Sequence, residues 1–248
     1  MATIWIWNSI ASRRRSSSDT FVENGLGVLA GAVEKAGHRV RIIDWARNGF
    51  YNHVTPVVLA RPARKLIVTL MKMSHGHKGM IFKTLGMLNL GLQQVMAYFQ
   101  KQRMAKALRQ LAKEVAHSGI RIFGMKVWYG EAFFWAKYLA NEIRKLAPDV
   151  LLVAGGYHAT LYEEDLLRHS PFDLAVISEG EAALSRMLSI VDEEEREPRT
   201  CHAEALGRRR IARMARIRKA IDDGSLKNVV YRDGDEIKKT GKTAGNIN

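Results

Sequence analysis

A pair of glycines follows one apolar run and precedes a helical pattern. Gly155 and Gly156 come directly after Val150–Ala154, in which every residue is apolar, and a helix is expected to begin within 157–160. Because glycine has no side chain, a ligand can approach the backbone there, and the free amides at a helix start favour an anion. A tight strand-to-helix turn explains paired glycines equally well. The residues alone leave both a ligand site and a turn open.

Two other groups of side chains have the residue types of catalytic or metal sites. Glu179 and Glu181 have the spacing of an acid/base pair, but we expect Glu181 to lie in the first turn of a helix, where the helix dipole stabilises a carboxylate. We expect Glu179 to accept hydrogen bonds from nearby amides. His75 and His77 have no third strong ligand close in sequence, and their basic neighbours repel cations. We therefore predict no catalytic residue and no metal ligand.

Alternating strands and helices must position these groups. The hydrophobic pattern predicts strands at 3–7, 39–43, 120–127, 150–154 and 174–177, and helices at 21–36, 131–146, 161–167 and 181–191. Strands that alternate with helices of this length form βαβ units. We therefore expect an α/β fold with a mostly parallel, doubly wound sheet of the flavodoxin or Rossmann-like type.

In an open parallel sheet, ligands bind at the carboxyl ends of the strands. The candidate ligand contacts are the residues at those predicted ends. They are Asn8 after the first strand; Lys126, Val127, Trp128 and Tyr129 at the third; Gly155, Gly156, Tyr157, His158 and Thr160 after the fourth; and Glu179 and Gly180 after the fifth. We expect these residues to meet at one edge of the sheet.

A basic segment interrupts the alternation of strands and helices. Residues 61–117 contain eleven Lys or Arg and one acidic residue, Glu114, with Met and Leu at helical spacing. We interpret 50–118 as a basic helical insertion within an α/β domain that spans 1–191. Its positive field would attract an acidic protein, nucleic acid or a membrane surface. Nucleic acid is the less favoured partner because no RNA-binding aromatic motif or recognition helix accompanies the charge. A lid with a cationic outer face is the alternative.

The end of the sequence, 192–248, is interpreted as a helical tail with a small hairpin. A basic helix is expected at 208–220. Two β-rich runs, 228–232 and 236–239, flank Asp233-Gly234-Asp235, which is a good turn signal. We therefore predict a C-terminal β-hairpin after the basic helix.

Composition narrows the class of protein. The 248 residues are 47% hydrophobic and 26% charged, as in ordinary globular proteins, and the formal net charge of +14 points to an anionic partner. A single cysteine, Cys201, excludes a disulfide framework and an iron–sulfur cluster held by three or more thiolates of this chain. Charged and amide residues interrupt the most apolar stretch, 80–99, so we predict no transmembrane segment. Without a visible secretory signal, a cytoplasmic location is expected.

Several of these segments resemble the cobalamin (vitamin B12) binding domain found in front of radical S-adenosylmethionine enzymes. Gly25–Val40 looks like that domain's first helix and second strand. Gly155–Thr160, Gly-Gly-Tyr-His-Ala-Thr, resembles its Gly-Gly-Pro-His-Ala-Thr turn with Tyr157 in place of proline, and Ser178–Glu181 resembles its Gly-Glu-Gly-Glu segment. The hairpin at 228–239 is similar to a short ribbon in such proteins. The likeness covers about 1–49 and 118–190, and the order of the motifs makes it fairly specific.

The resemblance implies a corrinoid held against the carboxyl edge of the sheet, with its nucleotide tail between sheet and helices. A flat ring needs a broad apolar platform, which Val127, Trp128 and Tyr129 would supply, although aromatic residues at a strand end also serve as core. Backbone amides and small residues at Gly155, Gly156 and Thr160 would hold the phosphate and ribose of the tail.

The chain departs from cobalamin-dependent enzymes in two ways. None of its eight histidines lies in the Asp-x-His-x-x-Gly motif that places an imidazole under cobalt in mutases, which fits the radical-enzyme branch. The Cys-x-x-x-Cys-x-x-Cys motif of the radical core is also missing, because Cys201 is the one cysteine. We therefore expect no complete catalytic apparatus on this chain, and at most a subunit of a cobalamin-dependent radical S-adenosylmethionine methyltransferase.

Three hypotheses follow for the function. The first is a cobalamin-binding module that serves methyl transfer with a separate radical S-adenosylmethionine subunit, or a truncated relative of such enzymes. The second is the nucleotide-sugar-binding half of a glycosyltransferase-like enzyme, which Gly25–Val40 also resembles, but the residues after Val191 are too few for its second domain. The third is a protein-interaction module that docks an acidic partner on the basic insertion.

Overall fold

A computed structural model describes residues 1–12, 24–45, 48–74, 79–196 and 207–241. It divides into two compact units. The sheet unit comprises Met1–Ile10, 21–44 and 108–248, and the helical unit comprises 11–20 and 45–107. Each unit is described by itself below.

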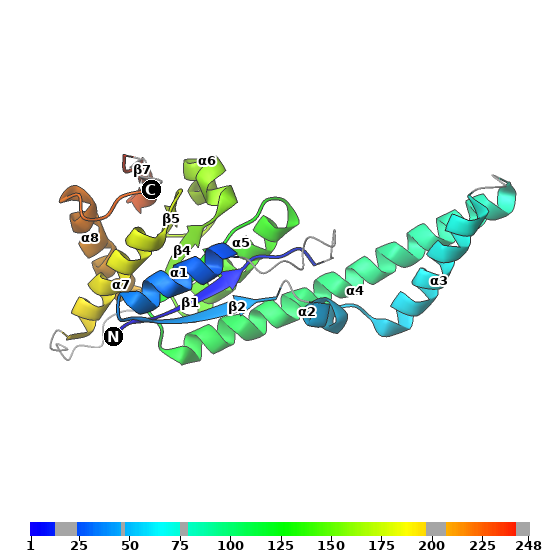
Figure 1. Cartoon of the computed structure of the whole chain (residues 1–248), viewed down its shortest axis with the longest axis horizontal. Coiled ribbons are helices and arrows are strands. Elements are labelled where there is room, and N and C mark those ends of the chain that lie inside the picture. Colours follow the sequence, from blue (N-terminus) through cyan, green and yellow to red (C-terminus); the bar gives the residue numbers. More distant parts are fainter. Residues whose placement is uncertain (13–23, 46–47, 75–78, 197–206, 242–248) are drawn as a thin grey trace. The chain divides into compact units, whose positions relative to one another are not determined.

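The sheet unit is built on seven strands in the order β2-β1-β3-β4-β5-β6-β7 (Figure 1). They are β1 (Thr3–Asn8), β2 (Arg39–Asp44), β3 (Ile122–Lys126), β4 (Leu151–Gly155), β5 (Leu174–Val176), β6 (Val229–Asp233) and β7 (Glu236–Lys239). The first five strands run parallel. Beyond β5, β6 pairs antiparallel with β5 and β7 pairs antiparallel with β6. The predicted mostly parallel α/β fold is confirmed.

The helices cover both faces of this sheet. One apolar core joins the sheet to α1 (Asn24–Lys35), α7 (Glu181–Arg196) and α8 (Arg208–Asp222). The β1–α1–β2 and β3–α5–β4 connections run in opposite directions across the sheet. Right-handed crossovers therefore place α5 (Glu131–Leu146) on the other face, and α6 (Tyr157–Arg168) follows it there.

The buried spacing of α5 explains why this segment forms an amphipathic helix. Trp135, Leu139 and Ile143 recur every fourth residue and are buried. The strands that the helices cover, β3 and β4, are almost wholly buried, as parallel strands with helices on both faces must be. The core therefore sits in two layers, one on each face of the sheet.

The structure differs from the sequence prediction mainly at element ends. The third strand is shorter than the predicted 120–127, and α7 continues to Arg196. α6 begins at Tyr157, within the stretch 157–160 where a helix start is expected, and so extends the helical pattern predicted at 161–167. These ends depend on tertiary contacts that no local pattern contains. The predicted start of the first helix at 21 lies outside the described residues.

The C-terminal segment is a structural part of the sheet unit. The predicted hairpin is confirmed, and its first strand pairs with β5 from Leu174↔Tyr231 to Val176↔Val229. Met214 and Ile217 of α8 lie in the same core as β1 and α7. We expected the tail to follow a domain ending at 191, but its contacts join it to the sheet. Local sequence shows that a hairpin forms but does not show which edge strand it extends.

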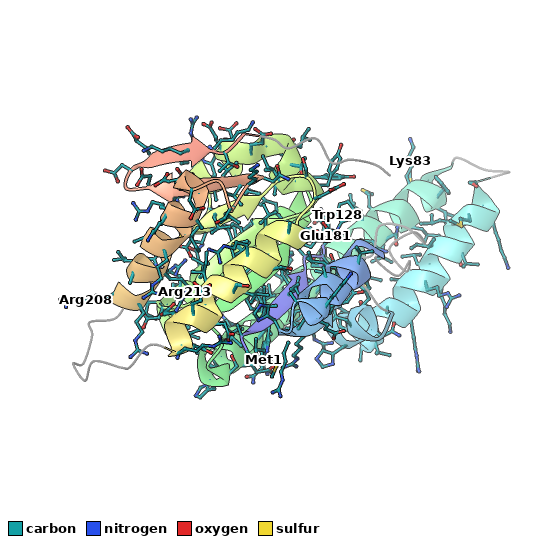
Figure 2. All side chains as sticks on the ribbon, turned by 60° about the vertical axis from the view of Figure 1, so that its left-hand side comes forward. Met1, Lys83, Trp128, Glu181, Arg208 and Arg213 are labelled. Carbon is teal, nitrogen blue, oxygen red and sulfur yellow. The ribbon has the colours of Figure 1, made fainter. Side chains whose placement is uncertain are left out.

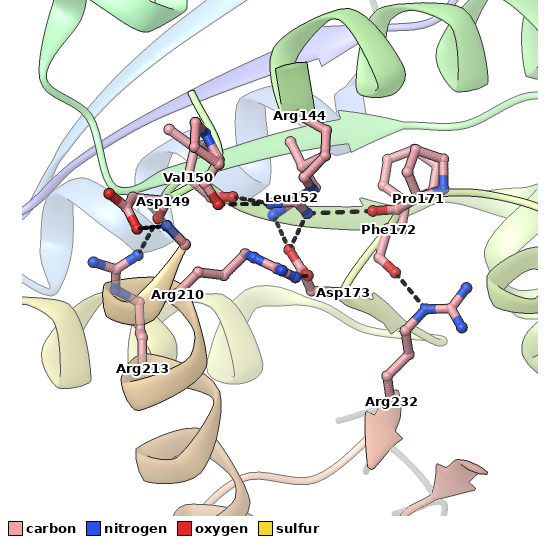
Figure 3. A network of polar contacts seen from close by, with 12 residues as sticks. Arg144, Asp149, Val150, Leu152, Pro171, Phe172, Asp173, Arg210, Arg213 and Arg232 are labelled. Carbon is pink, nitrogen blue, oxygen red and sulfur yellow. Dashed lines mark hydrogen bonds and ion pairs between the residues drawn. The ribbon is translucent and has the colours of Figure 1, made fainter. Parts of the chain in front are cut away.

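Buried charges fasten this segment to the amino ends of the central strands (Figure 3). The Asp173 carboxylate accepts hydrogen bonds from the Leu152 amide at 2.8 Å, from Arg144 at 2.6 Å and from Arg210 of α8 at 2.5 Å. Arg144 also donates to the Val150 carbonyl at 2.9 Å. Because the buried Asp173 carboxylate is paired with two guanidinium groups and a backbone amide, this network stabilises the junction between α8 and the sheet.

Arg213 of α8 makes the second attachment. Its side chain is 0% exposed, and it binds Glu194 through two hydrogen bonds of 2.7 and 3.1 Å. A further guanidinium nitrogen donates to the carbonyls of Arg121 at 3.2 Å and Asp149 at 2.9 Å. Arg121 directly precedes β3 and Asp149 lies two residues before β4, so one arginine connects α7, α8 and the starts of two strands.

The helical unit contains α2 (Asn48–Val54), α3 (Val57–Met73) and the first part of α4 (Met80–Ser118). The basic segment is helical as expected, whereas the bounds 50–118 of an insertion into the α/β domain stay a prediction. The Gln100 side chain donates to Thr55 at 2.9 Å, and Arg103 donates to the His53 carbonyl at 3.3 Å. These contacts connect α2 to α4 within the unit.

Candidate functional site

The strand register brings polar groups into one row at the carboxyl edge of the sheet. Asn8 is aligned with Asp44 of β2 and with Lys126 of β3, and Lys126 is aligned with Gly155 of β4. The chain order reverses between β1 and β3, which is where open α/β sheets bind ligands. Figure 2 shows Trp128 and Glu181 at this end of the sheet and Arg213 toward the other end.

The loop after β3 is fixed by β1. The Trp128 amide donates to the Ser9 hydroxyl at 2.9 Å, and the Trp128 indole donates to the Asn8 side-chain oxygen at 3.3 Å. Asn8 in turn donates to the Asp44 carboxylate at 3.1 Å. The Lys126 ammonium lies 5.0 Å from the centre of the Trp128 ring. These contacts hold the indole at the edge of the sheet without a ligand.

The two glycines of the turn after β4 differ in whether a side chain would fit in their place. The Val127 amide donates to the Gly155 carbonyl at 2.8 Å, and the His158 amide donates to the Val127 carbonyl at 3.2 Å. Gly156 has φ +91°, and a Cβ there would lie 3.0 Å from Cγ of Lys126. At Gly155 a Cβ would meet nothing closer than the Val176 carbonyl oxygen at 4.0 Å. The second glycine is therefore required by the backbone, whereas the first leaves space.

That space belongs to a hollow of about 290 Å³ between the sheet and helices α1 and α7. Its walls are small or aliphatic residues, and polar groups from β3 and the β5–α7 loop lie among them. The glycines that line it are Gly25, Gly124, Gly155, Gly156 and Gly180; the aliphatic residues include Ile4, Ile6, Leu29, Val153, Val176 and Leu184; the polar residues are Lys126, Ser178, Glu179 and Glu181. The arrangement fits a ligand with an apolar body and polar ends.

Thr160 links the two loops that border the hollow. Its hydroxyl donates to the Gly156 carbonyl at 3.3 Å and accepts a hydrogen bond from the Ser178 amide at 3.0 Å. Ser178 has φ +61°, which is uncommon for a residue other than glycine. Backbone strain of this kind occurs preferentially at functional sites, so the loop before α7 is part of the candidate site.

His158 lies on the other side of the glycine turn. Its ring is buried between Phe133 and Tyr162, with ring centroids 4.5 and 4.4 Å away. Its Nδ1 atom is buried without a hydrogen-bond partner in the described structure. Burial lowers the pKa of this imidazole below its ordinary value because the charged form would lose its solvation. Burial therefore favours the neutral form of the His158 imidazole.

The predicted contact residues lie at this edge of the sheet, but their side chains differ in exposure to solvent. Val127 is 0% exposed, so its side chain supports the loop, and its part in a ligand platform stays a prediction. Tyr129 and Tyr157 are exposed, and Trp128 is half-buried. Asn8 is buried and acts through Trp128.

Three residues in the wall of the hollow were not predicted from the sequence. The middle of β1 and β3 supplies Ile4, Ile6 and Gly124. In the sequence, nothing distinguishes Ile4 and Ile6 from ordinary strand residues. One signal was available, because a lone glycine inside a buried strand often marks a close approach by a ligand or another backbone. A Cβ on Gly124 would lie 3.4 Å from Ile6, directed toward this wall.

The described residues contain no group of three or more His, Cys, Asp or Glu side chains that could hold a metal ion. Cys201 and the predicted pair His75 and His77 lie outside the described residues. Among the helices described, none is long and apolar enough to cross a membrane.

One comparison with known proteins covers part of the residues that line the hollow. A family model for the B12 binding domain matches residues 87–188, which include β3, β4, β5 and the Gly155–Thr160 turn. The predicted resemblance is confirmed at these residues, which match the model of the B12 binding domain. No curated protein matches the chain in sequence.

Two solved structures are similar to this chain. The radical S-adenosylmethionine methyltransferase TsrM from Kitasatospora setae, with tryptophan substrate and a SAM analogue bound, has a TM-score of 0.52 and 12% identity, with 97% of this chain and 30% of TsrM covered. The cobalamin-dependent S-adenosylmethionine radical enzyme OxsB has a TM-score of 0.47 and 14% identity, with 98% and 23% covered. The chain therefore spans less than a third of the length of either protein. The TsrM likeness shows a shared fold.

Proposed function

We propose that this chain binds cobalamin at the carboxyl edge of its sheet and serves a radical S-adenosylmethionine partner. The observation that carries the proposal is the glycine-walled hollow beside the β1–β3 switch point, in a chain whose residues 87–188 match the model of the B12 binding domain. A side chain in place of Gly155 would enter the hollow, as expected for a cradle that keeps space for a ligand.

The residues present suit the two parts of such a cofactor. The hollow between the sheet and α1 and α7 would take the nucleotide tail, with Ile6, Val153 and Leu184 against its apolar base. The ring would lie at the outer edge, where Trp128 and the exposed Tyr129 offer aromatic surface.

Polar groups of the chain would orient the tail. Lys126 at the hollow would neutralise an anionic phosphate, and the Asn8–Trp128 hydrogen bond would hold the aromatic surface in place. Thr160 ties the glycine turn to the Ser178 loop, which keeps the entrance in one shape. These residues bind and orient, and none is assigned to bond making.

When bound, cobalamin would supply a cobalt centre for methyl transfer from S-adenosylmethionine to an unreactive carbon or phosphorus atom of the partner's substrate. TsrM, which shares this fold, is a radical S-adenosylmethionine methyltransferase, and this likeness supports the role. A neighbouring open reading frame that encodes Cys-x-x-x-Cys-x-x-Cys would identify the partner. If the reading frames around this one contain no such motif, the proposed partnership loses its support.

The binding proposal is tested with hydroxocobalamin and with cobinamide, which lacks the nucleotide tail. We expect the purified chain to retain about one hydroxocobalamin per chain after gel filtration, measured from its absorption spectrum. We expect cobinamide to bind at least about tenfold more weakly, because it leaves the apolar hollow unfilled. A colourless protein would contradict cobalamin binding, whereas equal binding of both compounds would contradict the assignment of the hollow to the tail.

A further inference from the structure

The helical unit combines two properties that ordinary solvent-facing helices do not share. Between residues 45 and 107 the sequence contains ten Lys or Arg and no Asp or Glu. Such a segment repels cations and other copies of itself, and it attracts anionic surfaces. This charge is separate from the cobalamin site, to which none of these residues contributes a lining group.

The same segment also exposes an unusual amount of apolar surface. In α3, Ala63 is the one described residue that is buried, and between 80 and 99 of α4, a stretch fully described, no residue is buried. The exposed large apolar side chains are Val57, Val58, Val68, Met71, Met80, Ile81, Met87, Leu88, Leu90, Val95, Tyr98 and Phe99. Contiguous apolar surface of this extent marks an interaction site.

Much of the apolar surface on α4 follows one helical stripe. Large apolar side chains at 80–81, 87–88, 95 and 98–99, with Thr84 and Gly91 between them, recur every three to four residues, and all these positions are exposed. At a rise of about 1.5 Å per residue, the stripe extends about 30 Å. Lys83 is the one charged residue between 80 and 99. Cations flank the stripe at Lys72 on α3 and at Lys101 further along α4.

The tip of the α3–α4 hairpin has the same composition. The two helices run back along one another, and Met71 of α3 and Met80 and Ile81 of α4 are all exposed near its end (Figure 1). Met80 is 84% exposed and Ile81 70%. In Figure 2 the Lys83 side chain projects outward from the ribbon of α4. Apolar side chains with lysines beside them suit the boundary between lipid headgroups and acyl chains.

We propose that the α3–α4 hairpin docks on the surface of an anionic membrane, with the α4 stripe at the acyl boundary and the lysines among the headgroup phosphates. Charge disfavours a second copy on this face, because ten cations would meet ten cations. An acidic protein is less well matched, because lysine is depleted in protein interfaces and the exposed apolar residues extend along both helices. A lipid surface requires no complementary shape.

Vesicle sedimentation tests this proposal. The full chain is mixed with phosphatidylcholine vesicles, or with vesicles of equal parts phosphatidylcholine and phosphatidylglycerol, and the bound fraction is measured. We expect binding to the anionic vesicles at least about tenfold tighter than to the neutral ones, with a decrease at high salt. Absence of binding to anionic vesicles overturns the proposal, as does formation of a dimer that buries the hairpin and prevents vesicle binding.

Matched variants locate the contact. Lys72→Glu with Lys83→Glu should weaken vesicle binding at least about tenfold, whereas Lys137→Glu with Lys227→Glu, which changes net charge equally in the sheet unit, should change it less than about threefold. Equal weakening by both pairs overturns the assignment to the hairpin. Tighter binding of the chain to soluble polyaspartate or duplex DNA than to anionic vesicles overturns it in favour of a protein or nucleic acid.

A fluorescence measurement tests whether the tip of the α3–α4 hairpin inserts into the membrane surface. With Cys201→Ser as background, an environment-sensitive dye on Ile81→Cys should shift its emission to the blue when anionic vesicles are added, whereas the same dye on Lys137→Cys should not shift. Unchanged emission at position 81 in vesicle-bound protein overturns the placement of the stripe at the acyl boundary. Circular dichroism confirms that each variant is folded.

Discussion

Gly155→Leu is expected to weaken hydroxocobalamin binding about 10- to 100-fold while leaving the fold intact. The glycine has no positive φ, and a Cβ there meets nothing closer than 4.0 Å, so the unliganded protein has room for the side chain. The added atoms would occupy the hollow that the tail needs, and overpacking of this kind costs about 1–3 kcal/mol. Equilibrium titration followed by the corrinoid absorption spectrum measures the change.

The matched control is Gly31→Leu on α1, where a Cβ would also meet nothing within 4 Å but which does not line the hollow. We expect this variant to bind hydroxocobalamin as the unchanged chain does. Thermal unfolding of both variants separates lost binding from lost structure. If Gly155→Leu is folded and binds with unchanged affinity, the ligand does not enter this hollow.

The second large effect is expected from Arg213→Ala, which should lower the free energy of unfolding by about 3–5 kcal/mol. The arginine is fully buried and binds Glu194, and its removal also leaves the carbonyls of Arg121 and Asp149 without this donor. The Arg121 carbonyl keeps its hydrogen bond from the Leu151 amide at 2.8 Å, so the unpaired Glu194 carboxylate is the main cost of the substitution. Urea unfolding followed by circular dichroism measures the change.

Arg196→Ala provides the comparison within the neighbouring helix. Its guanidinium also forms an ion pair, 2.7 Å from Asp192, but the side chain is 75% exposed. An exposed pair contributes about 0–1 kcal/mol, so this variant should unfold almost as the unchanged chain does. Similar small losses in both variants would show that α8 is not fastened to the sheet through Arg213.

The sequence predicts the repeating part of the fold because each element has its own local signal. The helix at 131–146 is reproduced to the residue, since Gly130 precedes it and its apolar residues recur at helical spacing. The parallel sheet follows from the alternation of such helices with apolar strands. Pairing of the hairpin with β5 could not be predicted, because it depends on an edge that only the folded sheet presents.

The loop residues of the candidate site could be predicted from the sequence, whereas the residues inside the hollow could not. Gly155, Gly156 and Thr160 are recognisable in a motif, and the structure shows the turn and the hydrogen bonds that this motif forms. The wall at Gly124 and the burial of Val127 depend on which face of the sheet each residue occupies. In strands buried on both faces, the sequence contains no alternation that distinguishes those faces.

The central claim is that the nucleotide tail of cobalamin lies between the sheet and helices α1 and α7. A crystal structure of the chain grown with hydroxocobalamin tests it most directly. We predict density for the tail beside Gly124 and Gly155, with the corrin ring at the edge formed by Trp128 and Tyr129. A corrinoid bound on any other face, with the hollow beside α1 left empty, would contradict the account.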